Sequence, residues 1–227
     1  MSLRKEEIAA TIEYPSSDGE PMAETDIHRK LMNRLIDTLE QFFHAESDVY
    51  VSGNLLIYYV EGDTRKRVAP DVFVVRGVGK QDRRVYKLWE EGRAPDVIIE
   101  LSSRQTWGED LQKKWRLYEQ LGVKEYYIFD PEYDYLPSPL LAYKLRDEQY
   151  EQIEVERGRV TSEELGLELV DTGETLRLYD PRSETFLPTA DEETDARIKA
   201  EEALRQSRQE VARLNEKLEK LRPEGSS

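Results

Sequence analysis

Two acidic residues stand inside apolar runs of the sequence, where an unpaired carboxylate is costly to bury. Asp71 follows Pro70 in the run Val-Ala-Pro-Asp-Val-Phe-Val-Val of residues 68–75, and Glu100 ends the run Pro-Asp-Val-Ile-Ile-Glu of residues 95–100. Such acids are tolerated where they are paired or bind a cation. At the ends of neighbouring strands, the two would form an oxygen-rich site for Mg²⁺ or Mn²⁺. Alternatively, each is an ordinary strand-end acid or a cap.

A lysine on the following helix could complete such a site. Residues 108–121 show helical spacing, with apolar side chains recurring on one face. Lys114 lies one turn before Tyr118, at the border of that face. Its ammonium either points at the carboxylates or reaches water while its stem covers apolar surface. Lys113 and Arg116 are expected to face solvent.

Other catalytic chemistries have little support in the sequence. The absence of cysteine excludes a disulfide scaffold, a thiolate metal site and cysteine catalysis. The chain has no glycine-rich phosphate loop, His-Glu-x-x-His or Gly-x-Ser-x-Gly motif, and its two histidines are His28 and His44. The formal net charge of −15 opposes non-specific binding to nucleic acid. It does not exclude an enzyme that acts on nucleic acid through a carboxylate metal site.

The order of the elements predicts an α/β (α+β) fold in which a mixed sheet packs against helices. Residues 1–23 are expected to be a lead-in, residues 24–190 the folded domain, and residues 191–227 a separate helix and tail. Helices are expected at residues 24–43 and 108–121. The expected strands are at residues 49–60 with a break at Gly53-Asn54, and at 68–75, 97–101, 125–129, 140–146, 149–155 and 175–179.

The C-terminal helix carries the spacing of a coiled coil. Leu204, Val211 and Leu218 are seven residues apart, and Leu214 and Leu221 occupy the complementary seam position. We expect a parallel homodimer through residues 197–221, because the central seam residue, Val211, is β-branched and suits a two-stranded coiled coil. The alternative is a single solvated helix lying on the domain.

The sequence also predicts a soluble cytoplasmic protein. A secretory signal has an apolar stretch after its first charges, and the first residues of this sequence have none. No run approaches the roughly 18 apolar residues of a membrane helix.

Several segments together resemble the Uma-two family, which is grouped with the restriction endonucleases of the PD-(D/E)xK nuclease superfamily. They are Ala-Pro-Asp at 69–71, Pro-Asp-Val-Ile-Ile-Glu-Leu-Ser-Ser at 95–103, Asp-Leu-Gln-Lys-Lys at 110–114, Tyr118, and Leu-Gly-Val-Lys-Glu-Tyr-Tyr-Ile-Phe-Asp-Pro at 121–131. The resemblance covers roughly residues 24–180. It implies a restriction-endonuclease-like core with a mixed four-stranded sheet flanked by helices.

The resemblance also implies roles for single residues. Asp71 and Glu100 match the two acids of the superfamily motif. Ser102 stands where the superfamily usually has lysine, and Lys114 takes the place of that lysine on the next helix. Glu24 and His28, one helical turn apart, match polar positions on the first helix of the family.

These matches imply a metal-dependent nuclease. Asp71, Glu100 and the backbone carbonyl of Leu101 would bind Mg²⁺ or Mn²⁺, and Lys114 would orient water or neutralise charge on a phosphate. The expected substrate is nucleic acid, DNA in the first instance. The alternative function is a catalytically inactive binding or assembly protein of the same fold that acts through its coiled coil. The net charge and Ser102 favour that alternative.

Overall fold

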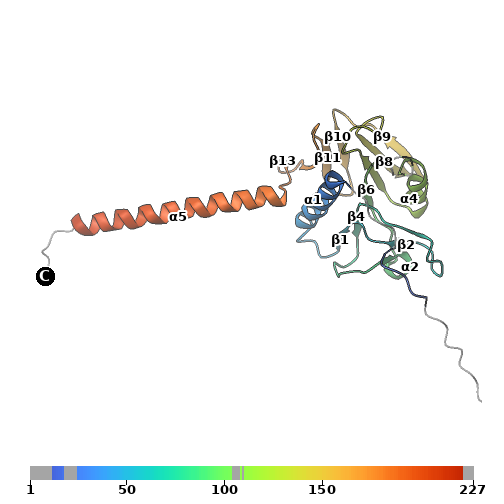
Figure 1. The fold of residues 1–227 in the computed structure, drawn as a ribbon, viewed down its shortest axis with the longest axis horizontal. Coiled ribbons are helices and arrows are strands. Elements are labelled where there is room, and N and C mark those ends of the chain that lie inside the picture. The colour runs from blue at the N-terminus through green and yellow to red at the C-terminus, as the bar shows by residue number, and fades with distance from the viewer. Residues whose placement is uncertain (1–11, 18–24, 104–107, 109, 222–227) are drawn as a thin grey trace, which may run out of the picture. The chain divides into compact units, whose positions relative to one another are not determined.

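The computed structural model describes residues 12–17, 25–103, 108 and 110–221 of the chain. The chain divides into two compact units, Met1–Leu187 and Pro188–Ser227. The first unit contains the sheets, and the second contains the long helix α5 (Ala190–Leu221) (Figure 1). In the described part of the chain, no helix has both the length and the apolar character needed to span a membrane.

A six-stranded sheet forms the centre of the first unit. Its order is β1-β4-β6-β7-β8-β9, and only the β6–β7 pair is parallel. The bounds are β1 Val49–Ser52, β4 Val72–Arg76, β6 Val97–Leu101, β7 Glu125–Phe129, β8 Leu140–Arg146 and β9 Gln149–Ile153. The predicted mixed α/β fold is confirmed. The sheet is larger than the four strands implied by the resemblance, because the β8–β9 hairpin extends it beyond β7.

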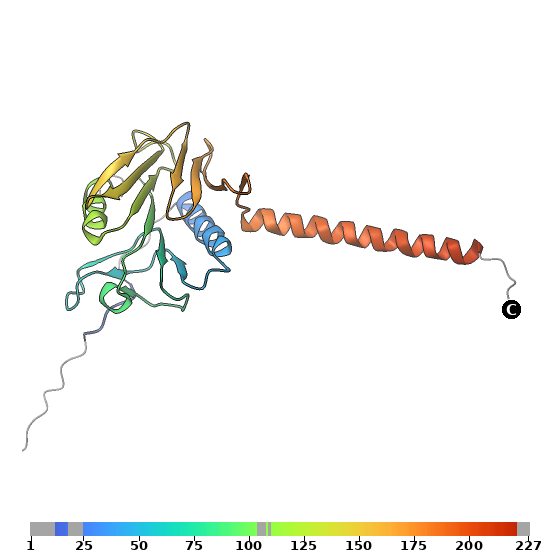
Figure 2. The same ribbon diagram turned by 180° about the vertical axis from the view of Figure 1, so that it is seen from behind.

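One face of this sheet is covered by helix α1 (Asp26–Phe42) and a second sheet (Figures 1 and 2). The apolar positions of α1 recur every three to four residues, so Leu31, Leu35 and Leu39 fall on one stripe and are buried. The second sheet is antiparallel, in the order β10-β11-β12-β13. Its bounds are β10 Arg159–Ser162, β11 Leu167–Asp171, β12 Leu176–Asp180 and β13 Thr185–Phe186.

The opposite face packs against helix α4 (Trp115–Leu121) and a small third sheet. Tyr118 of α4 and Tyr86 of the third sheet are fully buried against Phe73 and Ile98 of the central sheet. The third sheet has the order β3-β2-β5, with bounds β3 Arg67–Val68, β2 Ile57–Tyr58 and β5 Tyr86–Lys87. The short helix α2 (Leu88–Glu91) follows it.

Two of the predicted elements differ from the structure. The run of residues 68–75 is divided, because β3 ends at Val68 in one sheet and β4 begins at Val72 in another. Pro70, which has no N–H to donate, lies at the division. Within the helix predicted over 108–121, Asp110–Lys114 form a π-helical segment, η1, and the α-helix α4 runs from Trp115 to Leu121.

Candidate active site

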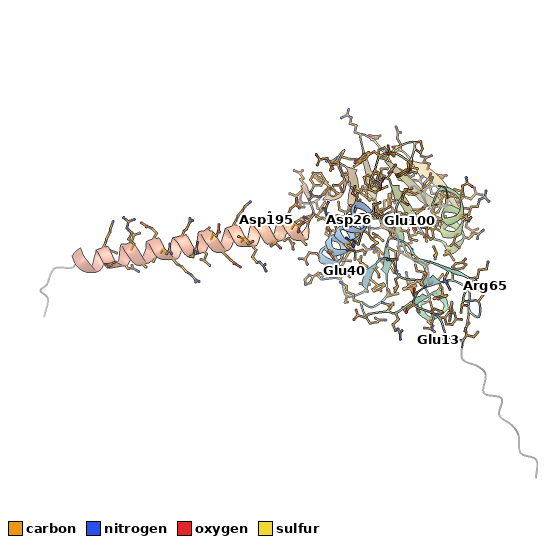
Figure 3. All side chains as sticks on the ribbon, in the orientation of Figure 1. Glu13, Asp26, Glu40, Arg65, Glu100 and Asp195 are labelled. Carbon is orange, nitrogen blue, oxygen red and sulfur yellow. The ribbon has the colours of Figure 1, made fainter. Side chains whose placement is uncertain are left out.

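Asp71 and Glu100 lie opposite each other where strands β4 and β6 pair. The two strands are antiparallel with Val72 opposite Ile99. Asp71, which precedes Val72, therefore lies opposite Glu100, which follows Ile99. The Asp71 N–H lies 3.4 Å from Glu100 Oε2, and the Leu101 N–H donates to Asp71 Oδ2 at 2.7 Å. The strand pairing therefore brings the two carboxylates together. Glu100, which is labelled in Figure 3, is buried.

Glu100 is held by two side chains from one helical segment. Lys114 Nζ lies 3.0 Å from Glu100 Oε2, and the Tyr118 hydroxyl donates to Oε1 at 2.6 Å. The side chain of Glu100 is 1% exposed, whereas that of Lys114 is 18% exposed. The buried carboxylate thus has a cation at the solvent side and a phenol in the core.

Asp71 is held by the first helix. Thr25 caps α1 and accepts from the His28 N–H at 3.3 Å, which fixes His28 in the first turn. His28 Nε2 lies 3.1 Å from Asp71 Oδ1, and the two side chains are 8% and 16% exposed. The site therefore joins α1, β4, β6 and η1.

The surroundings of Asp71 favour its charged form. Burial by itself raises the pKa of this carboxyl. The hydrogen bond and charge of His28, the charge of Lys114 and the Leu101 N–H lower it, and the net result is a pKa below the usual value. Asp71 is therefore a carboxylate at neutral pH.

Other residues singled out in the sequence have different places. Glu24 lies outside the described residues. Asp96, which precedes β6, pairs with Lys124 at 2.8 Å and accepts from the Arg76 N–H at 2.7 Å, so it stabilises the other end of the strand. Ser102 is buried and its N–H donates to the Phe129 carbonyl at 2.7 Å.

A close backbone contact beside Asp71 was not predicted from the sequence. The Asn54 N–H donates to the Pro70 carbonyl at 2.8 Å, and a Cβ added to Gly53 would lie 2.0 Å from the Asp71 carbonyl oxygen. The Gly53-Asn54 pair signals a turn, but its contact with residues 70–71 depends on tertiary structure. This turn supports the backbone that carries Asp71.

The donor set fits a hard divalent cation. Asp71 and Glu100 offer carboxylate oxygens, and the Leu101 carbonyl points to the same side of β6 as its N–H, which is the side of Asp71. Within the described ranges, no group of three or more histidine, aspartate or glutamate side chains is placed to hold a metal ion. Two carboxylates with a backbone oxygen suit Mg²⁺, which usually keeps several of its waters.

A family model described as "Putative restriction endonuclease", Uma2, matches residues 4–176. The chain belongs to the Uma2 family. This match confirms the resemblance drawn from the sequence segments. The description of the family supports a nuclease as the activity class of this Uma2 protein.

Other comparisons add less. No curated protein matches the chain. Among solved structures, the chain is similar to the crystal structure of "a putative nuclease belonging to DUF820" from Anabaena variabilis, with 15% sequence identity and a TM-score of 0.46. That similarity covers 64% of this chain and 76% of the other.

Proposed function

We propose that this Uma2 protein is a divalent-metal-dependent nuclease that hydrolyses phosphodiester bonds of DNA in the cytoplasm. The observation that carries the proposal is the pairing of Asp71 with Glu100 across two strands, with Lys114 3.0 Å from the inner carboxylate. Family membership supports the activity class. The identity of the metal, the substrate and the roles of the residues are parts of this proposal.

Asp71, Glu100 and the Leu101 carbonyl are the proposed ligands of Mg²⁺ or Mn²⁺. A bound ion of this kind polarises a phosphoryl oxygen and lowers the pKa of a coordinated water. The protein contributes a fixed pair of carboxylates, because the strand register and the Leu101 N–H hold them in place before substrate arrives. Preorganised charge of this kind needs little reorganisation during the reaction.

Lys114 and His28 have separate proposed roles. Lys114 is partly exposed, so its ammonium can turn from Glu100 towards a phosphate and offset the charge that develops there. His28 keeps Asp71 oriented through the 3.1 Å contact. Glu24, which lies outside the described residues, is proposed as a further polar group of the site. Hydrolysis then joins a water oxygen to phosphorus, breaks the bond to the leaving sugar oxygen, and gives that oxygen a proton.

We also propose that the protein is a homodimer formed through α5. Leu204, Val211, Leu214 and Leu218 are between 48% and 63% exposed on this helix. An apolar row repeated every seven residues is buried when two such helices pair. A second copy of this chain carries the same row and is the proposed partner.

A nicking assay tests the nuclease. Supercoiled plasmid is incubated with the full-length protein across a Mg²⁺ and Mn²⁺ titration, and a chelator is the control. We expect nicked circles only when metal is present. Single-stranded DNA and RNA are run beside the plasmid to define the substrate. If no nucleic acid is cut with any divalent metal, the inactive binding or assembly protein is the better account.

A further inference from the structure

Tyr118 contacts the proposed metal ligand Glu100 from the core. Its hydroxyl donates to Glu100 Oε1 at 2.6 Å, and its side chain is fully buried. Its ring packs edge-on against Tyr126, with ring centroids 5.1 Å apart. The phenol is therefore fixed at both ends, by ring packing and by the carboxylate.

Lys114 and Tyr118 hold different oxygens of the same carboxylate. They are four residues apart, so they project from the same side of successive turns. Lys114 contacts Oε2, the oxygen that also faces the Asp71 N–H, and it is the partly exposed member of the pair. A phosphate or a cation arriving from solvent meets Lys114 before it meets the buried phenol.

Glu100 needs an anchor that survives that exchange. A long lysine side chain has several rotatable bonds and holds one orientation only at an entropic cost. If Lys114 turns to a phosphate, its contact with Oε2 is lost and the carboxylate can rotate. A hydrogen bond to Oε1 prevents the rotation without occupying the oxygen that faces Asp71.

We propose that Tyr118 is a positioning residue that keeps Glu100 Oε2 aimed at Asp71 while Lys114 acts on the substrate. This inference rests on the proposed function, and it adds the Tyr118 hydroxyl to the strand register as a group that orients the metal ligand. Groups that hydrogen-bond to metal ligands typically change metal affinity or activity by about 10–100-fold when they are removed.

Mn²⁺ affinity measured by titration calorimetry tests the inference on full-length protein. Tyr118→Phe keeps the ring and removes the hydroxyl, so it should weaken Mn²⁺ binding about 10–100-fold. Tyr150→Phe is the matched control, because Tyr150 lies in the same apolar cluster and its buried hydroxyl has no hydrogen-bond partner among the described residues. The Mn²⁺ affinity of Tyr150→Phe should stay within about twofold of that of the parent, because the substitution removes no hydrogen bond among the described residues.

Turnover separates positioning from catalysis. At saturating Mn²⁺, plasmid nicking by Tyr118→Phe should return to within a few-fold of the parent, whereas Lys114→Ala should stay inactive. Thermal unfolding of each variant checks that the fold is retained. If Tyr118→Phe does not fold, 3-fluorotyrosine at position 118 keeps the ring and makes the hydroxyl a stronger donor. It should bind Mn²⁺ at least as tightly as the parent, and weaker binding overturns the inference.

The possible failures can be told apart. A parent that binds Mn²⁺, with Tyr118→Phe binding equally well, overturns the positioning role and leaves the proposed nuclease in place. A parent that binds no Mn²⁺ refutes the proposed metal site, and the role of Tyr118 falls with it.

Discussion

Glu100 and Lys114 form an ion pair in which one partner is shielded from water and the other is not. A carboxylate that is 1% exposed keeps its charge only with compensating partners, and here they are Lys114 and Tyr118. Lys114 is the partner that can reach solvent. We therefore expect Lys114 to have two effects that can be measured separately. It stabilises the metal-free protein through Glu100, and it is accessible to the proposed substrate.

Replacing Lys114 with alanine should show both effects. The variant should bind metal but lose turnover by about 10²–10³-fold, the usual cost of removing one charge-stabilising group. Its metal-free form should lose about 1–3 kcal/mol of unfolding free energy, because a buried acceptor loses a charged partner. Lys113→Ala is the control, since that exposed neighbour should change stability by about 0.5 kcal/mol or less. Nicking assays and urea unfolding measure both. A Lys114→Ala variant that cuts as fast as the parent would refute the role.

Asp71 gives a pH-dependent contribution to stability. Its pKa in the folded protein lies below that of an unfolded aspartate, about 3.9. The stabilisation is therefore fully present above about pH 5 and is lost as pH falls through the folded pKa. In urea unfolding of metal-free protein, Asp71→Asn should be less stable than the parent near neutral pH, and the difference should shrink as pH is lowered to about 3. A difference that does not vary with pH would contradict the lowered pKa.

The three main residues of the candidate site could be singled out from the sequence because each stands out from its local pattern. Asp71 and Glu100 are charges in apolar runs, and Lys114 is a cation at the edge of an apolar helix face. Their convergence could not be derived from those rules, because it depends on the register that places Val72 opposite Ile99. That register is a property of the folded sheet.

At the level of elements, the turn between β1 and β2 supports the strand that carries Asp71. Gly53 packs against the Asp71 carbonyl, and Asn54 donates to the Pro70 carbonyl at 2.8 Å. These two contacts hold residues 70–71, which immediately precede β4, against the turn. The turn therefore supports the backbone on which Asp71 is carried.

Gly53→Ala should disturb the site through the backbone. The added Cβ would lie 2.0 Å from the Asp71 carbonyl oxygen, so the turn or the start of β4 must move. We expect a loss of about 1–3 kcal/mol in unfolding free energy, typical of overpacking, and a lower nicking rate. Gly108→Ala is the control, because no atom of the described residues lies within 4 Å of its added Cβ. Equal stability and activity in the two variants would argue against the supporting role of the turn.

The elements differ in how well the sequence predicts them. The central strands β4, β6 and β7 were predicted because they are apolar runs, and they are neighbours in the central sheet. Strands β10 and β11 were not predicted. In the short β10 (Arg159–Ser162), exposed and buried residues alternate and few of them are apolar, so the sequence carries little strand signal there. The π-helical segment η1 is too short to leave a periodic signal in the sequence. That Lys114 lies at its end is therefore seen only in the folded chain.

At the level of the whole molecule, an acidic protein would have to bind the acidic substrate that we propose for it. The formal net charge of −15 disfavours general attraction to DNA, so the proposed binding would have to come from local groups and from the proposed metal. A dimer would present two sites to one nucleic acid, and linked sites raise the effective concentration at the second contact. The proposed pairing of α5 would therefore compensate for weak binding at each site.

The pairing of α5 can be tested in a chain that has no cysteine. In a parallel, in-register coiled coil, Leu204 of one helix meets Leu204 of its partner, so Leu204→Cys alone should form a disulfide-linked dimer under mild oxidation. Glu202→Cys is the control, because it lies off the seam. Deleting residues 191–227 should convert the dimer into a monomer in sedimentation. Leu204→Cys that stays uncrosslinked in a protein of dimer mass would indicate antiparallel helices. An unchanged mass after the deletion would place the interface in the first unit or show that the parent is a monomer.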